Sequence, residues 1–218
     1  MKHHLRFFVA VLFAAYFVAA YFLIAHYVVS KGVLHTPMLA WERNIPFLPW
    51  TFFIYILVYV TPLVAFLLLR TTVSLKAMFW SFFVSLTLHQ ICWIFYPVEF
   101  VLRPVIPPNS GSLLTVTDAF LRLDSPAVNC LPSLHVTYAF LSYFVLHVYR
   151  PRLAPWFLFL AVIISISTLT FKQHYVVDVA GGILTALLMK WIFLRRSPAR
   201  FPRRGNSPVR RSPEGEGG

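Results

Sequence analysis

The sequence predicts an all-α fold, a polytopic membrane protein whose six transmembrane helices form a bundle with polar clusters at its extracytoplasmic face. Apolar residues make up 59% of the 218 residues and charged residues only 12%, with a mean hydropathy of +0.72. A soluble domain carries about a quarter charged residues. The apolar residues are gathered into long runs, and the basic residues lie mainly in the loops beside these runs and in the tail. Water is therefore a poor solvent for most of this chain.

The first half of the chain contains three runs long enough to cross the hydrocarbon core of a bilayer, which takes about 20 residues. They are residues 7–29, 47–69 and 75–95. The first run follows a basic start, as a signal peptide does. It is longer than an h-region of about 7–15 residues, however, and no clear small-residue cleavage site follows it. We therefore expect it to be retained as a span.

The second half contains three further candidate spans, which follow a long loop. They are residues 134–149, 153–171 and 176–194. The first of these is short for a span, so we expect it to gain a turn or to tilt. The chain is thus predicted to cross the membrane six times.

Loop charges predict the orientation, because Lys and Arg accumulate in short cytoplasmic loops. Six spans put both termini on one side, and that side holds most of the basic residues: Lys2, Arg6, Arg70, Lys76, Arg150, Arg152, Arg195, Arg196 and the arginines of the tail. The opposite side holds nearly all the acids and few bases. We therefore predict cytoplasmic termini and extracytoplasmic polar loops, in the plasma (inner) membrane.

Residues 1–196 are interpreted as one six-helix domain with its motifs within residues 96–178, and residues 197–218 as a disordered basic cytoplasmic tail. The net charge of +12 would suggest nucleic-acid binding in a soluble protein. No nucleic-acid module is visible, so membrane orientation explains the charge and no nucleic-acid partner is expected. Cys92 and Cys130 match no metal spacing. A disulfide between them and two unpaired thiols both remain open.

An ionisable pair begins the last span. His174 and Asp178 are four residues apart, so they share one face of a helix, with Asp178 about one turn deeper in the membrane. A charged residue there costs roughly 2.5–3.5 kcal/mol on insertion scales and marks a functional site by default. The carboxylate can fix the imidazole tautomer and stabilise positive charge on the ring, which leaves the other nitrogen free to attack or to move a proton. A helix-to-helix hydrogen bond with a structural role is the alternative.

Two further polar groups lie on the same side. The segment Pro132-Ser133-Leu134-His135 opens a helix, where Pro suits the first turn and Ser can act as the cap. Free N–H groups at such a helix start favour an anion such as phosphate, and His135 could protonate a leaving oxygen, although capping alone explains the motif. Arg103 offers a planar fork for phosphate oxygens, unless it is simply solvated. Together these groups are the parts that phosphoryl transfer needs.

In order and spacing, the motifs resemble the type 2 phosphatidic-acid phosphatase superfamily. Its pattern is Lys-x6-Arg-Pro, then Pro-Ser-Gly-His, then Ser-Arg-x5-His-x3-Asp. The resemblance covers about residues 75–194, and the matching residues are Arg103, Pro104, Pro132, Ser133, His135, Ser167, His174 and Asp178.

The resemblance implies an enzyme that acts on a phospholipid or another lipid phosphate, with an extracytoplasmic active site and without a metal or other cofactor. His174 would be the nucleophile that becomes phosphohistidine, Asp178 its orienting partner, and His135 the general acid. Arg103, Ser133 and backbone amides would bind the phosphate.

Three positions depart from the family pattern: Tyr96 stands at the first-motif Lys, Leu134 at the second-motif Gly and Thr168 at the third-motif Arg. The phosphate site therefore lacks two cations, and we predict that Lys172 replaces one of them. The chain is more similar to the branch that contains inositolphosphotransferases and, more distantly, sphingomyelin synthases. Enzymes of that branch exchange head groups between lipids, so transfer is slightly favoured over hydrolysis.

Two other functions fit the same residues. A small transporter or flippase could use His174 and Asp178 as a proton relay. It would need polar residues near the midplane of several spans, whereas His89 and Gln90 lie near the outer end of theirs. A catalytically inactive scaffold is the third reading, and the presence of both histidines and the aspartate argues against it.

Overall fold

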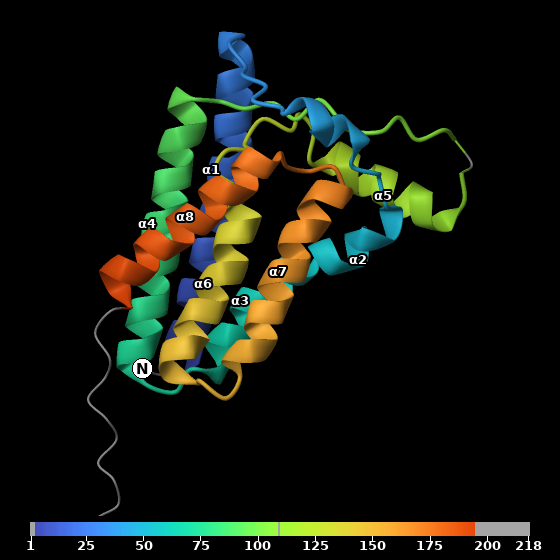
Figure 1. Cartoon of the computed structure of the whole chain (residues 1–218). Helices are drawn as coiled ribbons and strands as arrows, with labels where there is room; N and C mark the ends of the chain where they lie inside the picture. Colours follow the sequence, from blue (N-terminus) through green and yellow to red (C-terminus); the bar gives the residue numbers. More distant parts are fainter. Residues whose placement is uncertain (1–2, 109, 195–218) are drawn as a thin grey trace, which may run out of the picture.

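The computed structural model describes residues 3–108 and 110–194, and within them it is helical (Figure 1). The only β-type pairing among these residues is two isolated bridges, His35 with Val98 and Val98 with Asn129. The all-α prediction is confirmed. The elements are α1 (His3–Lys31), η1 (Ala40–Asn44), η2 (Pro49–Thr51), α2 (Phe52–Tyr55), α3 (Leu57–Leu68), α4 (Thr72–Phe95), α5 (Ser112–Leu123), α6 (Leu134–Tyr149), α7 (Ala154–Thr170) and α8 (Val176–Phe193).

Four stretches of helix in the described residues are long and apolar enough to cross a membrane: Val11–Lys31, Pro49–Leu68, Thr72–Phe95 and Val176–Phe193. The helices α6 and α7 are also apolar but shorter, with 16 and 17 residues. Each apolar run of the sequence therefore forms a helix, and these helices fit a membrane protein. The count of six spans stays a prediction, and the predicted tail, residues 197–218, lies outside the described residues.

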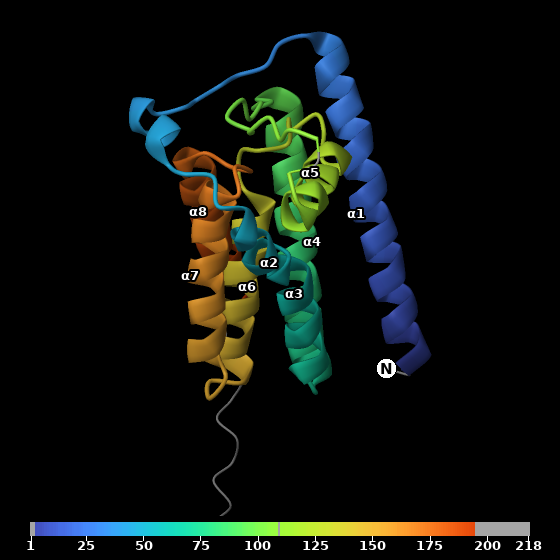
Figure 2. The same ribbon diagram turned by 90° about the vertical axis from the view of Figure 1, so that its right-hand side faces the viewer.

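The helix α6 is the centre of the bundle. It packs against α3, α4, α7 and α8, while α1 packs on α4 at the edge. Figure 2 shows α1 standing beside the bundle on the far side of α4 from α7. The main core cluster unites side chains from these central helices, among them Ala65, Phe82, Leu141 and Met189. The first helix is thus the least enclosed.

The long connections share one end of the bundle, opposite the end at which the described chain begins (Figures 1 and 2). The segment between α4 and α6, expected to be a loop, contains the helix α5. Its buried residues Thr117 and Leu121 face inward, and Phe120 packs against Phe52 and Phe171. Helix α5 has only 12 residues, which is shorter than a membrane span of about 20 residues. The length criterion for spans therefore does not identify it.

Small residues allow α8 to approach α6. A Cβ atom at Gly182 would lie 2.6 Å from the carbonyl oxygen of Ser133 and 3.0 Å from the Cβ of Val136. The hydroxyl of Thr137 donates to the carbonyl oxygen of Gly182 at 2.9 Å. Because α8 carries no side chain at this contact, the N-terminal ends of the two helices meet.

Candidate active site

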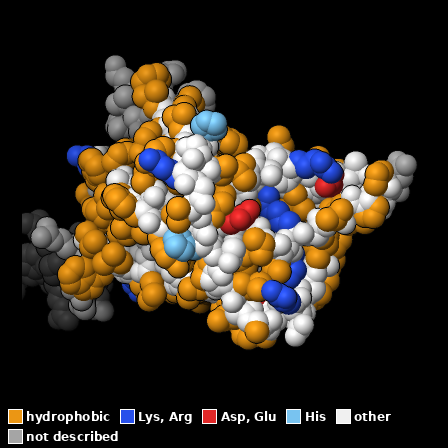
Figure 3. All heavy atoms as spheres, turned by 90° about the horizontal axis from the view of Figure 1, so that it is seen from above, with side chains coloured by type: hydrophobic (Ala, Val, Ile, Leu, Met, Phe, Trp, Pro, Cys, Tyr) orange, Lys and Arg blue, Asp and Glu red, His pale blue; other side chains and the backbone are white. Residues whose placement is uncertain are grey.

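The N-terminal ends of α6 and α8 and the turn at residues 171–175 converge at the end of the bundle that carries the long connections. Figure 3 looks onto this end, where basic, acidic and histidine side chains lie among hydrophobic side chains, other side chains and backbone. The backbone N–H of Ser133 donates to the backbone carbonyl of Asp178 at 2.9 Å. This bond fastens the start of α6 to the start of α8, so the second and third sequence motifs form one site.

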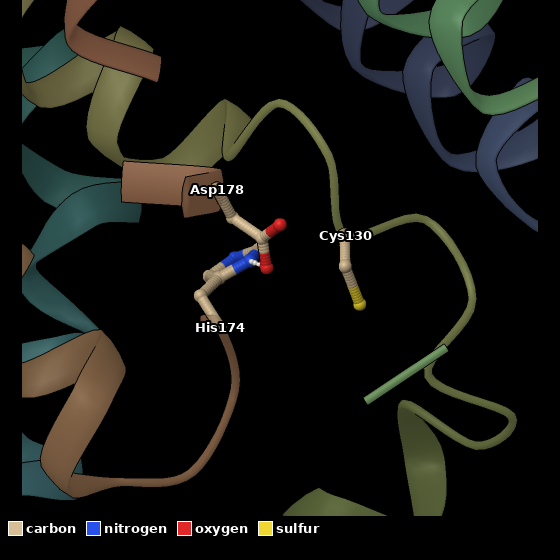
Figure 4. Close-up of side chains that lie close together, drawn as sticks. All are labelled: Cys130, His174 and Asp178. Atoms are coloured by element: carbon tan, nitrogen blue, oxygen red, sulfur yellow. Dashed lines mark ion pairs between the residues drawn. The ribbon is translucent and has the colours of Figure 1, made fainter. Parts of the chain in front are cut away.

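His174 and Asp178 are brought together as predicted. Nδ1 of His174 lies 3.4 Å from Oδ2 of Asp178, and the two side chains are 5% and 0% exposed. In Figure 4 the carboxylate lies against the imidazole. The same Oδ2 accepts the backbone N–H of Tyr175 at 2.8 Å, which fixes the carboxylate at the start of α8. Nδ1 of His174 and Oδ1 of Asp178 are buried without a hydrogen-bond partner, so the two side chains are in close polar contact without a hydrogen bond between them.

His135 lies on the other side of His174. Its Nδ1 is 3.2 Å from Nε2 of His174, so Nε2, the nitrogen that faces away from Asp178, points to the second histidine. Nε2 of His135 contacts the hydroxyl of Tyr55 at 2.7 Å and that of Tyr59 at 3.4 Å. The four groups Tyr55, His135, His174 and Asp178 therefore form a continuous chain of polar contacts.

Tyr55 and Tyr59 belong to no motif of the sequence and were not predicted to lie at the site. Both lie in an apolar run, and only the packing of α3 against α6 and of α2 against α7 brings their hydroxyls to His135. A tyrosine in such a run is ordinarily read as a packing residue, so the sequence offers no signal that separates these two from the other tyrosines.

Ser133 acts as the N-cap of α6. Its hydroxyl oxygen accepts the backbone N–H of Val136 at 3.3 Å, and the side chain is fully buried. The helix N-terminus points into the site as expected, but the hydroxyl is already engaged by the helix. The role of Ser133 in phosphate binding stays a prediction.

Lys172 stands in the turn before His174 with a φ of 58° and is 6% exposed. Its Nζ lies 3.5 Å from the backbone carbonyl oxygen of Glu42 in η1. Burial lowers the pKa of Lys172, and the nearby Glu42 carboxylate partly opposes this shift. Glu42 also accepts the backbone N–H of Val176 at the start of α8. The lysine therefore joins η1 to the turn, and its contact with phosphate stays a prediction.

Arg103 is held by acceptors of the protein. Its guanidinium donates to the side-chain carboxylate and the carbonyl oxygen of Asp124, and to the carbonyl oxygen of Leu121. It also donates to the amide oxygen of Gln173 at 2.7 Å. Arg103 therefore reaches the residue next to His174. The acidic partner Asp124, which also accepts the hydroxyl of Tyr21 from α1, was not foreseen.

Cys130 lies beside the histidine–aspartate pair (Figure 4). Its sulfur, a His174 nitrogen and an Asp178 oxygen all lie within 4.8 Å of one another, and the three residues are buried. Such a donor set suits Zn²⁺, whereas the sequence predicts no metal. Burial raises the pKa of the Cys130 thiol. Cys92 and Cys130 are both free, so the disulfide left open by the sequence does not form.

The apolar helices fit a membrane protein, and two histidines and an aspartate lie together at one end of their bundle. Residues 31–192 match the family described as the PAP2 superfamily, which points to a phosphatase-type enzyme. The chain therefore belongs to the PAP2 superfamily, as its motifs predicted. A search of curated proteins and a search of solved structures each returned no match.

Proposed function

We propose that the protein transfers a phosphoryl group from a lipid phosphate to an acceptor through a phosphohistidine intermediate on His174. The observation that supports this most directly is the orientation of the His174 ring. One nitrogen faces the buried carboxylate of Asp178 and the other faces His135. An imidazole held in this way has one nitrogen stabilised by negative charge and one free to attack phosphorus.

In the first step Nε2 of His174 attacks the phosphorus atom, and the bond between phosphorus and the lipid oxygen breaks. The protonated ring of His135 gives its Nδ1 proton to the departing oxygen. The hydroxyl of Tyr55 accepts the other ring N–H of His135, and Asp178 stabilises the positive charge that develops on His174. In the second step an acceptor hydroxyl or water gives its proton to His135 and attacks phosphorus, which releases His174.

The rings of His135 and His174 must separate for this reaction, because their nitrogens lie only 3.2 Å apart. A phosphoryl group bonded to one nitrogen and hydrogen-bonded to the other does not fit that gap. Substrate binding therefore replaces a contact between two rings by a contact of each ring with phosphate.

Arg103, Ser133 and Lys172 are the proposed phosphate ligands, together with the backbone N–H groups at the start of α6. Arg103 and Lys172 have their donors directed to Asp124 and to Glu42 in the structure. Each would exchange one protein acceptor for a phosphate oxygen. A charge-assisted contact of this kind in a water-poor site contributes on the order of 3 kcal/mol to transition-state stabilisation.

We further propose that the acceptor is a second lipid, as in the branch with inositolphosphotransferases. Tyr96 and Thr168 replace two cations of the family pattern, and a site with fewer cations holds released phosphate less well. The acceptor hydroxyl would then arrive from the membrane and not from water.

The intermediate is tested with purified protein and a lipid labelled on its phosphate, quenched under basic conditions that preserve phosphohistidine. Label should remain on the parent chain, map to the peptide that contains His174, and be absent from His174→Ala. The same reaction with and without a second lipid distinguishes transfer from hydrolysis. An active His174→Ala variant would remove the nucleophile from the proposal. A parent protein that neither keeps the label nor turns over lipid phosphate would favour the proton-relay transporter.

A further inference from the structure

An apolar pocket of about 180 Å³ lies between α1, α3, α4 and α6. The wall on α1 is made by Phe13, Ala14, Phe17 and Tyr21. Helix α1 stands at the edge of the bundle beside α4 (Figure 2). The family match begins at residue 31, so this wall comes from a helix outside the matched range.

The pocket reaches the active site. His135 and Tyr59 belong to its lining, and His135 is the residue that contacts His174. Away from His135 the lining is apolar, with Phe17, Val58 and Pro62 as typical members. The group proposed to protonate the leaving oxygen therefore lies at one end of an apolar chamber, where the rest of a leaving alcohol would continue.

The size and polarity of the pocket indicate what can occupy it. An engineered cavity of about 150 Å³ takes up benzene, so 180 Å³ holds a chain segment on the order of six carbon atoms. A charged or strongly polar occupant would lose its hydration without compensation. Hydrocarbon is the occupant that this lining accepts.

Two buried polar atoms in the lining residues lack partners. They are Nε1 of Trp93, a donor, and Oδ1 of Asn129, an acceptor. Asn129 is held in place because its amide nitrogen donates to the backbone carbonyl of Tyr21 in α1 at 2.9 Å. Buried polar atoms ordinarily find partners. A lipid whose chain begins at an ester, amide or hydroxyl group can supply a partner to each of them, whereas a plain alkane cannot.

We propose that this pocket binds the first part of the hydrocarbon chain of the lipid phosphate, and that the chain reaches it from the bilayer between α1 and α3. This inference rests on the proposed function for its substrate, and it adds the place of the chain. The lipid then lies with its phosphate between His135 and His174 and its polar linkage near Trp93 and Asn129. The size of the α1 side chains at the pocket sets which chains are accepted.

The test fills the pocket from α1. Ala14→Trp introduces a large side chain at a lining position, and Ala15→Trp places the same side chain at the next, exposed position of α1, which is not part of the lining. The measured quantity is the ratio of kcat/KM for a long-chain phosphatidic acid to kcat/KM for p-nitrophenyl phosphate, which has no alkyl chain. Ala14→Trp should lower this ratio roughly tenfold, which is the loss expected when about two methylene groups of the lipid are no longer buried against apolar side chains. Ala15→Trp should keep the parent ratio.

An unchanged ratio in Ala14→Trp would overturn the proposal, and so would an equal loss in both tryptophan variants. A second measurement does not depend on turnover. A phosphatidic acid with a photoreactive group early in its chain should label the peptide of α1 in the parent protein and in His174→Ala, and label it less in Ala14→Trp. If the parent protein neither turns over lipid nor forms phosphohistidine but still labels α1, then the proposed chemistry fails and the chain-binding pocket stands. If α1 is not labelled, the pocket is wrong while the chemistry stands.

Discussion

Replacing Gly182 by Ala should separate the start of α8 from the start of α6 and disable the site. The added Cβ would lie 2.6 Å from the carbonyl oxygen of Ser133 and 3.0 Å from the Cβ of Val136. The first contact is with backbone at the N-cap of α6, so no flexible side chain can move out of the way. The helices must shift relative to each other, and the shift passes directly to His135, two residues after Ser133.

Two effects on the free energy of unfolding oppose each other. Alanine in place of glycine within a helix stabilises it by about 0.5–1 kcal/mol. Overpacking at a tight contact costs about 1–3 kcal/mol, and a backbone contact of 2.6 Å belongs at the upper end of that range. The net destabilisation should be about 2–2.5 kcal/mol, which leaves the protein folded. A displacement of about 1 Å between catalytic groups can cost on the order of 100-fold in rate, so activity should fall much more than stability.

The matched control is Gly181→Ala, where the added Cβ would lie 3.2 Å from the Cβ of Pro132 and 3.3 Å from Cδ1 of Leu131. These contacts are with side-chain atoms and are less severe. Thermal unfolding should show little change in stability for Gly181→Ala and a moderate loss for Gly182→Ala. Turnover of a lipid phosphate in detergent should fall strongly in Gly182→Ala alone. Parent-like turnover in Gly182→Ala would show that the close approach of α8 and α6 does not position His135.

Four further variants or labelling experiments test separate parts of the structure. Asp178→Asn keeps an oxygen that can accept the Tyr175 N–H, so stability should change little, while turnover should fall about 10³-fold or more because the charge and the tautomer are lost. Tyr55→Phe should lower kcat with KM unchanged. Tyr59→Phe should lower kcat less, because the hydroxyl of Tyr59 is farther from His135. Equal effects of the two variants would show that Tyr55 does not position His135. Of the two native thiols, Cys130 should react with a thiol reagent only after unfolding, because burial raises the pKa of this thiol; rapid labelling in the native protein contradicts this. For the predicted topology, an impermeant reagent on intact cells should label Ser112→Cys and spare Arg152→Cys in a chain without the native cysteines, and the reverse pattern would invert the orientation.

Much of the fold and part of the site could be predicted from the sequence, since both depend on local patterns. The apolar runs predicted the helices. The four-residue spacing of His174 and Asp178 predicted that these two side chains share one face of a helix. The 3.4 Å contact between them follows from that spacing once α8 begins at Val176. The pairing of His135 with His174 was implied by the family motif and was not visible in local sequence.

The partners that come from distant segments could not be predicted. Tyr55 contacts His135, which lies 80 positions later in the sequence. Glu42 accepts the backbone N–H of Val176, which lies 134 positions later. Arg103 was predicted to bind phosphate, but in the structure its guanidinium donates a hydrogen bond to the carboxylate of Asp124. These contacts depend on how the loops fold over the end of the bundle, and neither periodicity nor motif spacing encodes that arrangement.

The two short helices have a consequence for the surrounding bilayer. Helix α6 has 16 residues and α7 has 17, which at about 1.5 Å per residue gives lengths of roughly 24 and 26 Å. A hydrocarbon core is about 30 Å thick. With six spans, α7 would be shorter than the hydrocarbon core, and the lipid beside it would thin locally at a cost of fractions of a kcal/mol per Å. A thinner hydrocarbon layer would bring lipid head groups closer to the end of the bundle at which α6 begins.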